Sequence, residues 1–193
     1  MPRLRSVKSL RQPAAALAGI LALSAGILMA MGRTWWCKCG SPVPWSWDIW
    51  TLHNSQHLLD PYSFSHVQHG FLFYGLMFLV LRRRAPLTRF SAAMALEAAW
   101  EILENTSFII QRYREATISL DYFGDTILNS LSDILACALG YGLAFLLPAW
   151  SSLTLFTLIE LVMMFTLRDS LLINILMLVA PVDAVRTWQM GGK

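Results

Sequence analysis

The chain has 193 residues, of which 56% are hydrophobic and only 14% are charged, with eight tryptophans and a formal charge of +3. Because the hydrophobic residues form long runs, this composition excludes an ordinary soluble domain. It predicts an all-α polytopic transmembrane bundle, built as a single integral membrane domain over residues 1–193. The basic residues cluster at the ends of the apolar runs, where membrane topology accounts for them, so the positive charge does not predict a nucleic-acid partner.

The first apolar run follows a basic N-terminal segment. Residues 1–13 carry four basic residues and no acid, and the run 14–31 has no charged residue. A run of this length crosses the ~30 Å hydrocarbon layer of a bilayer. We interpret it as an uncleaved first span, because no small-x-small cleavage site follows it.

A loop of mixed character, rich in tryptophan, covers residues 32–65. We expect Cys37 and Cys39 not to form a disulfide, because two cysteines one residue apart fit the geometry of that bond poorly. A metal or redox role for the pair is the less favoured alternative. The stretch 48–57 is predicted to be a short interfacial helix with His53 and His57 on one side. We interpret these two histidines as surface residues.

The second and third spans are expected at residues 64–81 and 87–109. The second begins with His66 and His69, which are three residues apart and therefore neighbours on a helix surface. The third contains Glu97, Glu101 and Glu104 at positions i, i+4 and i+7, on one helix face. Because one charge deep in a bilayer costs at least about 2.5–3.5 kcal/mol, these carboxylates need partners from other helices.

Three more apolar segments follow a polar loop. The fourth span is predicted at residues 124–147, with Asp125, Asn129 and Asp133 along one face. The fifth, at 153–167, carries one acid, Glu160, expected to snorkel or to be singly paired. The last segment, 171–182, is short for a crossing, so five and six spans are both open.

The distribution of arginine and lysine predicts the orientation. The N-terminal segment and the loop 82–89 carry four basic residues each, which assigns both to the cytoplasm. The start of the second span, the end of the third and the start of the fourth then lie toward the outer surface. Asp133 lies about 12 Å deeper than Asp125 at 1.5 Å per residue. The sequence thus predicts a His/carboxylate cavity open to the outer leaflet.

Several short motifs identify a family resemblance. The chain resembles an uncharacterised family of bacterial multi-pass inner-membrane proteins, classed as a domain of unknown function. The resemblance covers nearly the whole chain and implies a location in the bacterial inner membrane, but it implies no reaction. The motifs are Ser55-Gln-His57-Leu-Leu-Asp60, Ser65-His66-Val-Gln-His69-Gly70, Glu97-Ala-Ala-Trp-Glu101-x-x-Glu104-Asn105, Arg112-Tyr-Arg114-x-Ala-Thr, Gly124-Asp125-x-x-x-Asn129-Ser-x-x-Asp133 and Arg168-Asp169-Ser-x-x-x-Asn174.

The favoured hypothesis is a site for a divalent metal such as zinc, manganese or iron, because imidazoles and carboxylates from three helices are the ligands that such ions use in bundles. The substrate would be a membrane lipid or an envelope component, with Glu101 and Glu104 in catalytic roles and Glu104 as general base. The predicted metal ligands are His66, His69, Glu97, Glu101, Asp125 and Asp133; Asn105, Asn129 and Asp121 would orient them, and Arg112 and Arg114 would bind a lipid headgroup.

Two alternatives remain open. The acids and imidazoles form a polar network that only ties helices together, although such contacts average ~0.6 kcal/mol in membranes. Otherwise they relay protons in a proton-coupled transporter. Residues 91–94 and 136–145, the inner halves of the third and fourth spans, carry no ionisable side chain apart from Cys137 and Tyr141, which disfavours a charged path across the membrane. Whether the chain is an enzyme stays open.

Overall fold

The computed structural model describes residues 8–119 and 121–191, and this part of the chain is all-helical, as predicted. Thr106, Thr126 and Ser170 begin three of the helices, each by accepting a hydrogen bond from a backbone N–H of the first turn. The eight helices are α1 (Lys8–Ala30), α2 (Ser63–Val80), α3 (Pro86–Glu104), α4 (Ser107–Ala116), α5 (Ile127–Leu146), α6 (Ala149–Leu167), α7 (Leu171–Val179) and α8 (Asp183–Met190).

Within the described residues, five helices are 18 or more residues long: α1, α2, α3, α5 and α6. Three of them, over Arg11–Ala30, Ile127–Leu146 and Ala149–Leu167, are apolar enough along their length to cross a membrane. Helix α7 has nine residues, which is about 14 Å at 1.5 Å per residue. The helix is therefore shorter than the predicted segment 171–182, and whether it makes a sixth crossing stays open.

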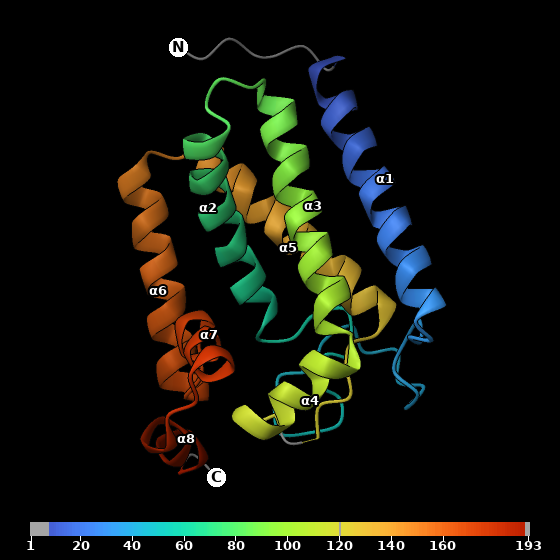
Figure 1. The fold of residues 1–193 in the computed structure, drawn as a ribbon, viewed down its shortest axis with the longest axis vertical. Coiled ribbons are helices and arrows are strands. Elements are labelled where there is room, and N and C mark those ends of the chain that lie inside the picture. The colour runs from blue at the N-terminus through green and yellow to red at the C-terminus, as the bar shows by residue number, and fades with distance from the viewer. Residues whose placement is uncertain (1–7, 120, 192–193) are drawn as a thin grey trace.

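The third predicted span is also corrected. Residues 87–109 do not form one helix, because α3 ends at Glu104 and Thr106 begins α4 after a short break. Asn105 lies at this break and donates a hydrogen bond from Nδ2 to the carbonyl of Glu101 at 2.9 Å. The chain direction changes there, and α4 runs across the end of the bundle instead of continuing α3 (Figure 1).

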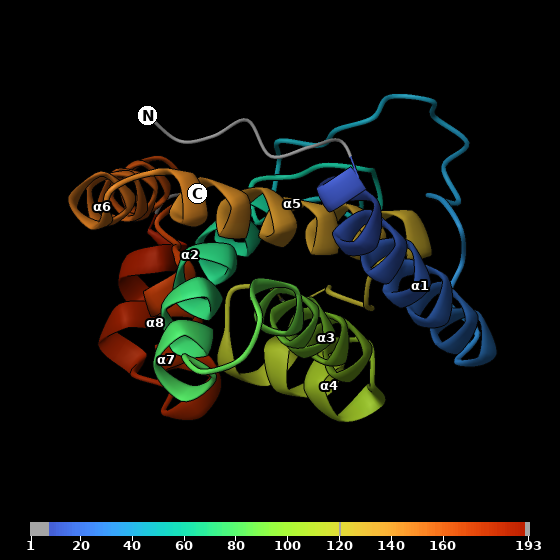
Figure 2. The ribbon, with the colours of Figure 1, turned by 90° about the horizontal axis from the view of Figure 1, so that it is seen from above.

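Helices α2, α3 and α5 form the centre of the bundle, with α1 against α3 and α5 and with α6 beside α2 and α5 (Figures 1 and 2). The α2–α5 crossing brings two backbones into direct contact at Gly70 and Gly140. A Cβ atom at Gly140 would lie 1.9 Å from the carbonyl oxygen of Val67, and one at Gly70 would lie 2.2 Å from that of Cys137. Only glycine permits this approach.

The two ends of the bundle are built differently. Toward the α2–α3 connection, the interior is an apolar cluster of Met77, Ala93, Met94, Cys137 and Tyr141. Helices α4, α7 and α8 and the loop between α1 and α2 gather at the opposite end (Figure 1). The polar residues of α2, α3 and α5 lie toward this second end, so the fold brings them together as predicted.

The loop 31–62 is ordered by turns. The predicted interfacial helix at 48–57 is wrong, because these residues form turns and bends. The loop is held against the start of α5 by side chains that bind backbone carbonyls. Arg33 donates from Nε to Asp125 and from Nη1 to Phe123, both at 2.9 Å, and Gln56 Nε2 donates to Gly124 at 2.8 Å.

Candidate functional site

Two imidazoles of α2 share one carboxylate of α3. Glu97 Oε1 lies 2.6 Å from His66 Nδ1, and the two carboxylate oxygens of Glu97 lie 3.1 and 3.0 Å from His69 Nδ1. Glu97 is fully buried and His66 is 7% exposed. Because Glu97 binds the Nδ1 side of both rings, it fixes how the two imidazoles are turned. This placement gives Glu97 an orienting role as well as the ligand role predicted for it.

Glu101 lies one turn along α3 from Glu97. Its side chain is fully buried, and Oε1 is 3.3 Å from His66 Nδ1. Among the described residues, neither carboxylate oxygen of Glu101 accepts a hydrogen bond. A fully buried carboxylate without a hydrogen-bond donor is costly, so such a group marks a functional site more often than a structural one.

The other face of His66 is turned toward α5. His66 Nε2 lies 3.9 Å from Asp133 Oδ2, and Ser63 Oγ donates to Asp133 Oδ1 at 2.9 Å. His66 therefore stands between the glutamates of α3 and the aspartate of α5. Side-chain atoms of two triads approach one another within 4.8 Å: His66, His69 and Glu97, and His66, Glu101 and Glu104. These are distances at which three groups can hold one metal ion.

Asn105 joins the end of α3 to the start of α5. Its amide donates to Asp125 Oδ2 at 3.0 Å and to Ser130 Oγ at 3.2 Å, while its Oδ1 accepts from the Asp125 backbone N–H at 2.8 Å. Tyr122 O–H donates to Asp125 Oδ1 at 2.8 Å. Burial and the Asp125 charge raise the pKa of Tyr122 well above its ordinary value, so this phenol stays protonated as a donor.

A cavity of about 70 Å³ opens beside these groups. A water molecule needs roughly 10–15 Å³ of such space, so the cavity holds a few waters or an ion with part of its hydration shell. One wall is apolar and comes from α7 through Leu171, Ile175 and Leu178. The polar lining residues are Asn54, Ser55, Tyr62, Ser65, His66, His69, Glu104, Tyr113, Ser119, Tyr122, Asp125, Asn129, Asp133 and Asn174.

Two further acids, Asp60 and Asp169, hold the segments around the cavity. Asp60 accepts hydrogen bonds from the backbone N–H groups of Ser55 and Tyr62 at 3.0 and 2.7 Å, and from Asn129 Nδ2 at 3.4 Å. Tyr62 O–H donates to Asp169 Oδ2 at 2.8 Å, next to the start of α7. Burial raises the pKa of the Asp169 carboxyl from 3.8 to about 6, and burial also raises the pKa of Asp60.

The structure brings most of the predicted site residues together and leaves three outside. Asp121 is exposed and does not line the cavity. Arg112 donates from Nε to the carbonyl of Leu178 at 2.8 Å, and Arg114 donates from Nε to the carbonyl of Tyr122. These two contacts tie α4 to α7 and to the segment before α5. Headgroup binding by the two arginines stays a prediction.

Several residues of the site were not predicted. Tyr113 lines the cavity together with Glu104, Ser63 binds Asp133, and Asp60 binds Asn129. Asp60 stands at the end of the Ser55-to-Asp60 motif, which was a usable signal. The apolar wall of α7 gave no signal, because Leu171–Val179 reads as an ordinary hydrophobic run. Glu160 accepts from Gln68 Nε2 and the Leu172 N–H, both at 3.2 Å, as a paired acid away from the cavity.

The loop before α2 corrects two predictions. Cys37 and Cys39 form a disulfide. His53 is exposed, as expected of a surface residue, whereas the same expectation is wrong for His57. Both rings lie against the cysteine pair: His53 Nδ1 is 3.6 Å from Cys37 Sγ and His57 Nε2 is 4.0 Å from Cys39 Sγ. His57 is 3% exposed.

Comparison with known proteins identifies relatives over almost the whole chain. The family described as protein of unknown function, DUF2585, matches residues 28–191. A UPF0314 protein of Rhizobium meliloti is 49% identical over 173 residues, which is 90% of this chain and 88% of the relative. UPF0314 proteins of Sphingopyxis alaskensis and Paracoccus denitrificans are 44% and 45% identical, over 91% and 88% of this chain and 93% and 88% of their own. No solved structure matches the chain.

Proposed function

Since the chain belongs to the DUF2585 family, whose description names no activity, we propose its function from the site alone: it is an inner-membrane enzyme that holds a divalent metal ion at the His/carboxylate cavity and acts on a lipid or envelope substrate. The observation that carries this proposal is Glu101. This carboxylate is fully buried, accepts no hydrogen bond from the described residues and lies 3.3 Å from His66. A bound cation supplies the missing partner.

The donor set fits zinc, manganese or iron. His66 offers an imidazole, and Glu101 and Asp133 offer hard oxygens. Glu97 holds both imidazoles through Nδ1, and His66 has Glu101 on its Nδ1 side and Asp133 on its Nε2 side. Asn105 and Ser63 orient Asp125 and Asp133 in the same way. A metal ion in such a site lowers the pKa of its bound water and supplies a nucleophile at neutral pH.

The shape of the cavity supports an amphiphilic substrate. One wall carries Leu171, Ile175 and Leu178, while the opposite side carries acids and imidazoles. A molecule with a polar group next to an apolar chain satisfies both walls. At about 70 Å³ the cavity admits the reacting polar group and not a whole lipid. With the arginine-rich end in the cytoplasm, the cavity faces the outer leaflet.

Glu104 is the residue we assign as general base. It is partly exposed and lines the cavity together with Tyr113. A base in this position can take a proton from water or from a substrate hydroxyl, while Glu101 stays behind His66 as a ligand. The two glutamates, one turn apart, thus take different roles.

A transporter is the weaker candidate for this site. Toward the α2–α3 connection, the interior of these helices is filled by Met77, Ala93, Met94, Cys137 and Tyr141. Gly70 of α2 and Gly140 of α5 bring the two backbones into contact. No chain of ionisable groups continues through this part of the described bundle. A proton path across the membrane would need one.

The test separates metal binding from turnover. Protein purified in detergent with a tag that contains no histidine is analysed for metal and assayed on vesicles of inner-membrane lipids, with product detection by mass spectrometry. We expect Glu101→Gln to lose the bound metal without a fall in melting temperature, since it removes a buried charge. Glu104→Gln should keep the metal and lose at least 10²-fold in turnover, the usual size of a general-base contribution.

Glu160→Gln is the matched control, because Glu160 is a buried acid of the same bundle that lies outside the cavity. It should keep both metal and turnover. Equal metal content in wild type, Glu101→Gln and His66→Gln would refute the metal site. Proton-driven flux in proteoliposomes that Glu101→Gln abolishes would favour the transporter instead.

A further inference from the structure

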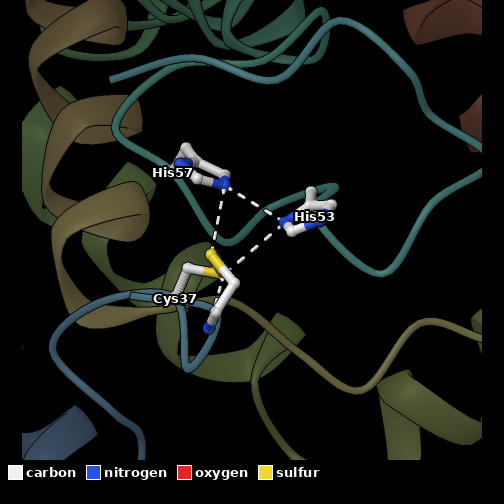
Figure 3. Close-up of side chains that lie close together, drawn as sticks. Cys37, His53 and His57 are labelled. Carbon is white, nitrogen blue, oxygen red and sulfur yellow. Dashed lines mark hydrogen bonds between the residues drawn. A yellow bond between two sulfur atoms is a disulfide. The ribbon is translucent and has the colours of Figure 1, made fainter. Parts of the chain in front are cut away.

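The second cluster of metal-ligand side chains lies in the loop between α1 and α2. It contains Cys37, Cys39, His53 and His57, and one ligand atom of each approaches those of the others within 4.8 Å. His53 and His57 are turned toward the two sulfur atoms from the far side of the loop (Figure 3). We propose that the reduced form of this cluster binds Zn²⁺ through two thiolates and two imidazoles. The site is separate from the cavity and does not depend on the function proposed above.

The distances between the nitrogen and sulfur atoms suit tetrahedral coordination. With Zn–S near 2.3 Å and Zn–N near 2.05 Å, a tetrahedron places S and N about 3.6 Å apart and the two N atoms about 3.3 Å apart. The structure has 3.6 Å for Cys37 Sγ to His53 Nδ1, 4.0 Å for Cys39 Sγ to His57 Nε2, and 3.3 Å between the two nitrogens. A disulfide alone needs neither histidine.

The groups around the cluster support thiolates and a fixed imidazole. The N–H of Cys39 donates to Cys37 Sγ at 3.2 Å, and the N–H of Ser41 donates to Cys39 Sγ at 3.4 Å. His57 Nδ1 lies 2.6 Å from the carbonyl of Val43, so it carries the proton and leaves Nε2 free to bind a metal. Trp36 packs edge-on against the same ring at 5.4 Å.

Zinc binding and the disulfide are alternative states of the same two sulfurs. Reduction of the Cys37–Cys39 bond takes two electrons and two protons from a dithiol, which becomes a disulfide itself, and gives two thiols. Zn²⁺ then forms two bonds to sulfur and two to nitrogen, and both thiol protons pass to water. A Cys₂His₂ set fills all four positions of a tetrahedral ion, as in structural zinc sites.

The position of the cluster indicates the structural role of a bound zinc ion. Its last ligand, His57, directly follows Ser55 and Gln56; Ser55 lines the cavity, and Gln56 binds the carbonyl of Gly124. Asp60, three residues further on, holds both Ser55 and Tyr62. Zinc would close the loop on itself beside this segment and so fix the cavity edge formed by residues 54–62.

The experiment uses the full chain, without a histidine tag, reduced with a phosphine and equilibrated with Zn²⁺. We expect one zinc equivalent in Glu101→Gln, which removes the proposed cavity site, and loss of that equivalent when Cys37→Ser or His57→Gln is added. Cys137→Ser is the matched control, because Cys137 is buried in α5, away from the loop. In the Glu101→Gln background, a zinc equivalent retained with both Cys37→Ser and His57→Gln would overturn the proposal.

Titration with Co²⁺ keeps the proposal testable if those variants do not fold. Reduced wild-type protein should develop the thiolate-to-cobalt charge-transfer absorption of a tetrahedral site, and Zn²⁺ should displace it. Oxidation to the disulfide should prevent it. Reduced protein that shows no such absorption would overturn the proposal.

Discussion

The two ends of the α2–α3–α5 bundle show how one set of helices carries two kinds of interior. At the end nearer the α2–α3 connection, Met94 packs in a cluster without charged side chains. At the other end, His66, Glu97 and Glu101 are buried on the same helices. The glycine crossing of α2 and α5 lies between them. The apolar half and the crossing therefore stabilise the fold. Because they do, the polar half can contain buried imidazoles and carboxylates that reduce stability.

The largest expected effect comes from the crossing itself. Gly140→Ala would place Cβ 1.9 Å from the Val67 carbonyl oxygen, so α2 and α5 must separate and both interiors lose their packing. We expect a loss of more than about 4 kcal/mol, or no folded protein. Size-exclusion chromatography and thermal unfolding in detergent provide the measurement.

The control for the crossing is Gly142→Ala, on the same helix, where a Cβ meets no atom within 4 Å. There the change should leave the protein folded and gain about 0.5–1 kcal/mol from helix propensity. If the two alanine variants unfolded alike, the crossing would not be the element on which both ends depend.

The second-largest expected effect tests whether the apolar cluster is the stabilising core. Met94→Ala removes a fully buried side chain from the cluster and should cost about 2–5 kcal/mol in the free energy of unfolding. Leu96→Ala, two residues away and 39% exposed, should cost much less. Denaturant unfolding in mixed micelles compares the two variants. Equal losses would mean that this cluster is not the stabilising core.

The smallest effect concerns pH at the polar end. Because burial raises the pKa of Asp169 from 3.8 to about 6, the folded state holds its proton more tightly than the unfolded chain. Stability from this group is therefore highest below pH 4 and is lost as pH rises to 6, by roughly 3 kcal/mol at most. Asp169→Asn should flatten that part of the pH profile of melting temperature.

Asp183→Asn, at an exposed position of α8, serves as the control for this profile. It should leave the decline between pH 4 and pH 6 as in the wild type. A decline unchanged in Asp169→Asn would assign the pH dependence to other groups.

Much of the fold and part of the site could be predicted from sequence. Apolar runs located the long helices, and the i, i+4, i+7 spacing placed Glu97, Glu101 and Glu104 on one helix face. The predicted orientation of the spans placed this face at the same end of the bundle as His66. The break at Asn105 was missed because a cap inside an apolar run changes neither its length nor its composition. The disulfide and the histidines beside it were missed because loop contacts depend on turns that no periodicity reports.

Helix α7 is held at both ends by side chains from other parts of the molecule. Tyr62 binds Asp169 just before its first turn, and Arg112 binds the carbonyl of Leu178 in its last. Between these two contacts, Leu171 and Ile175 line the cavity. For the lipid substrate proposed above, entry would require this short helix to move aside, because the cavity holds only about 70 Å³. The rate of that opening, and not the chemistry behind it, would then limit how fast the site can be loaded.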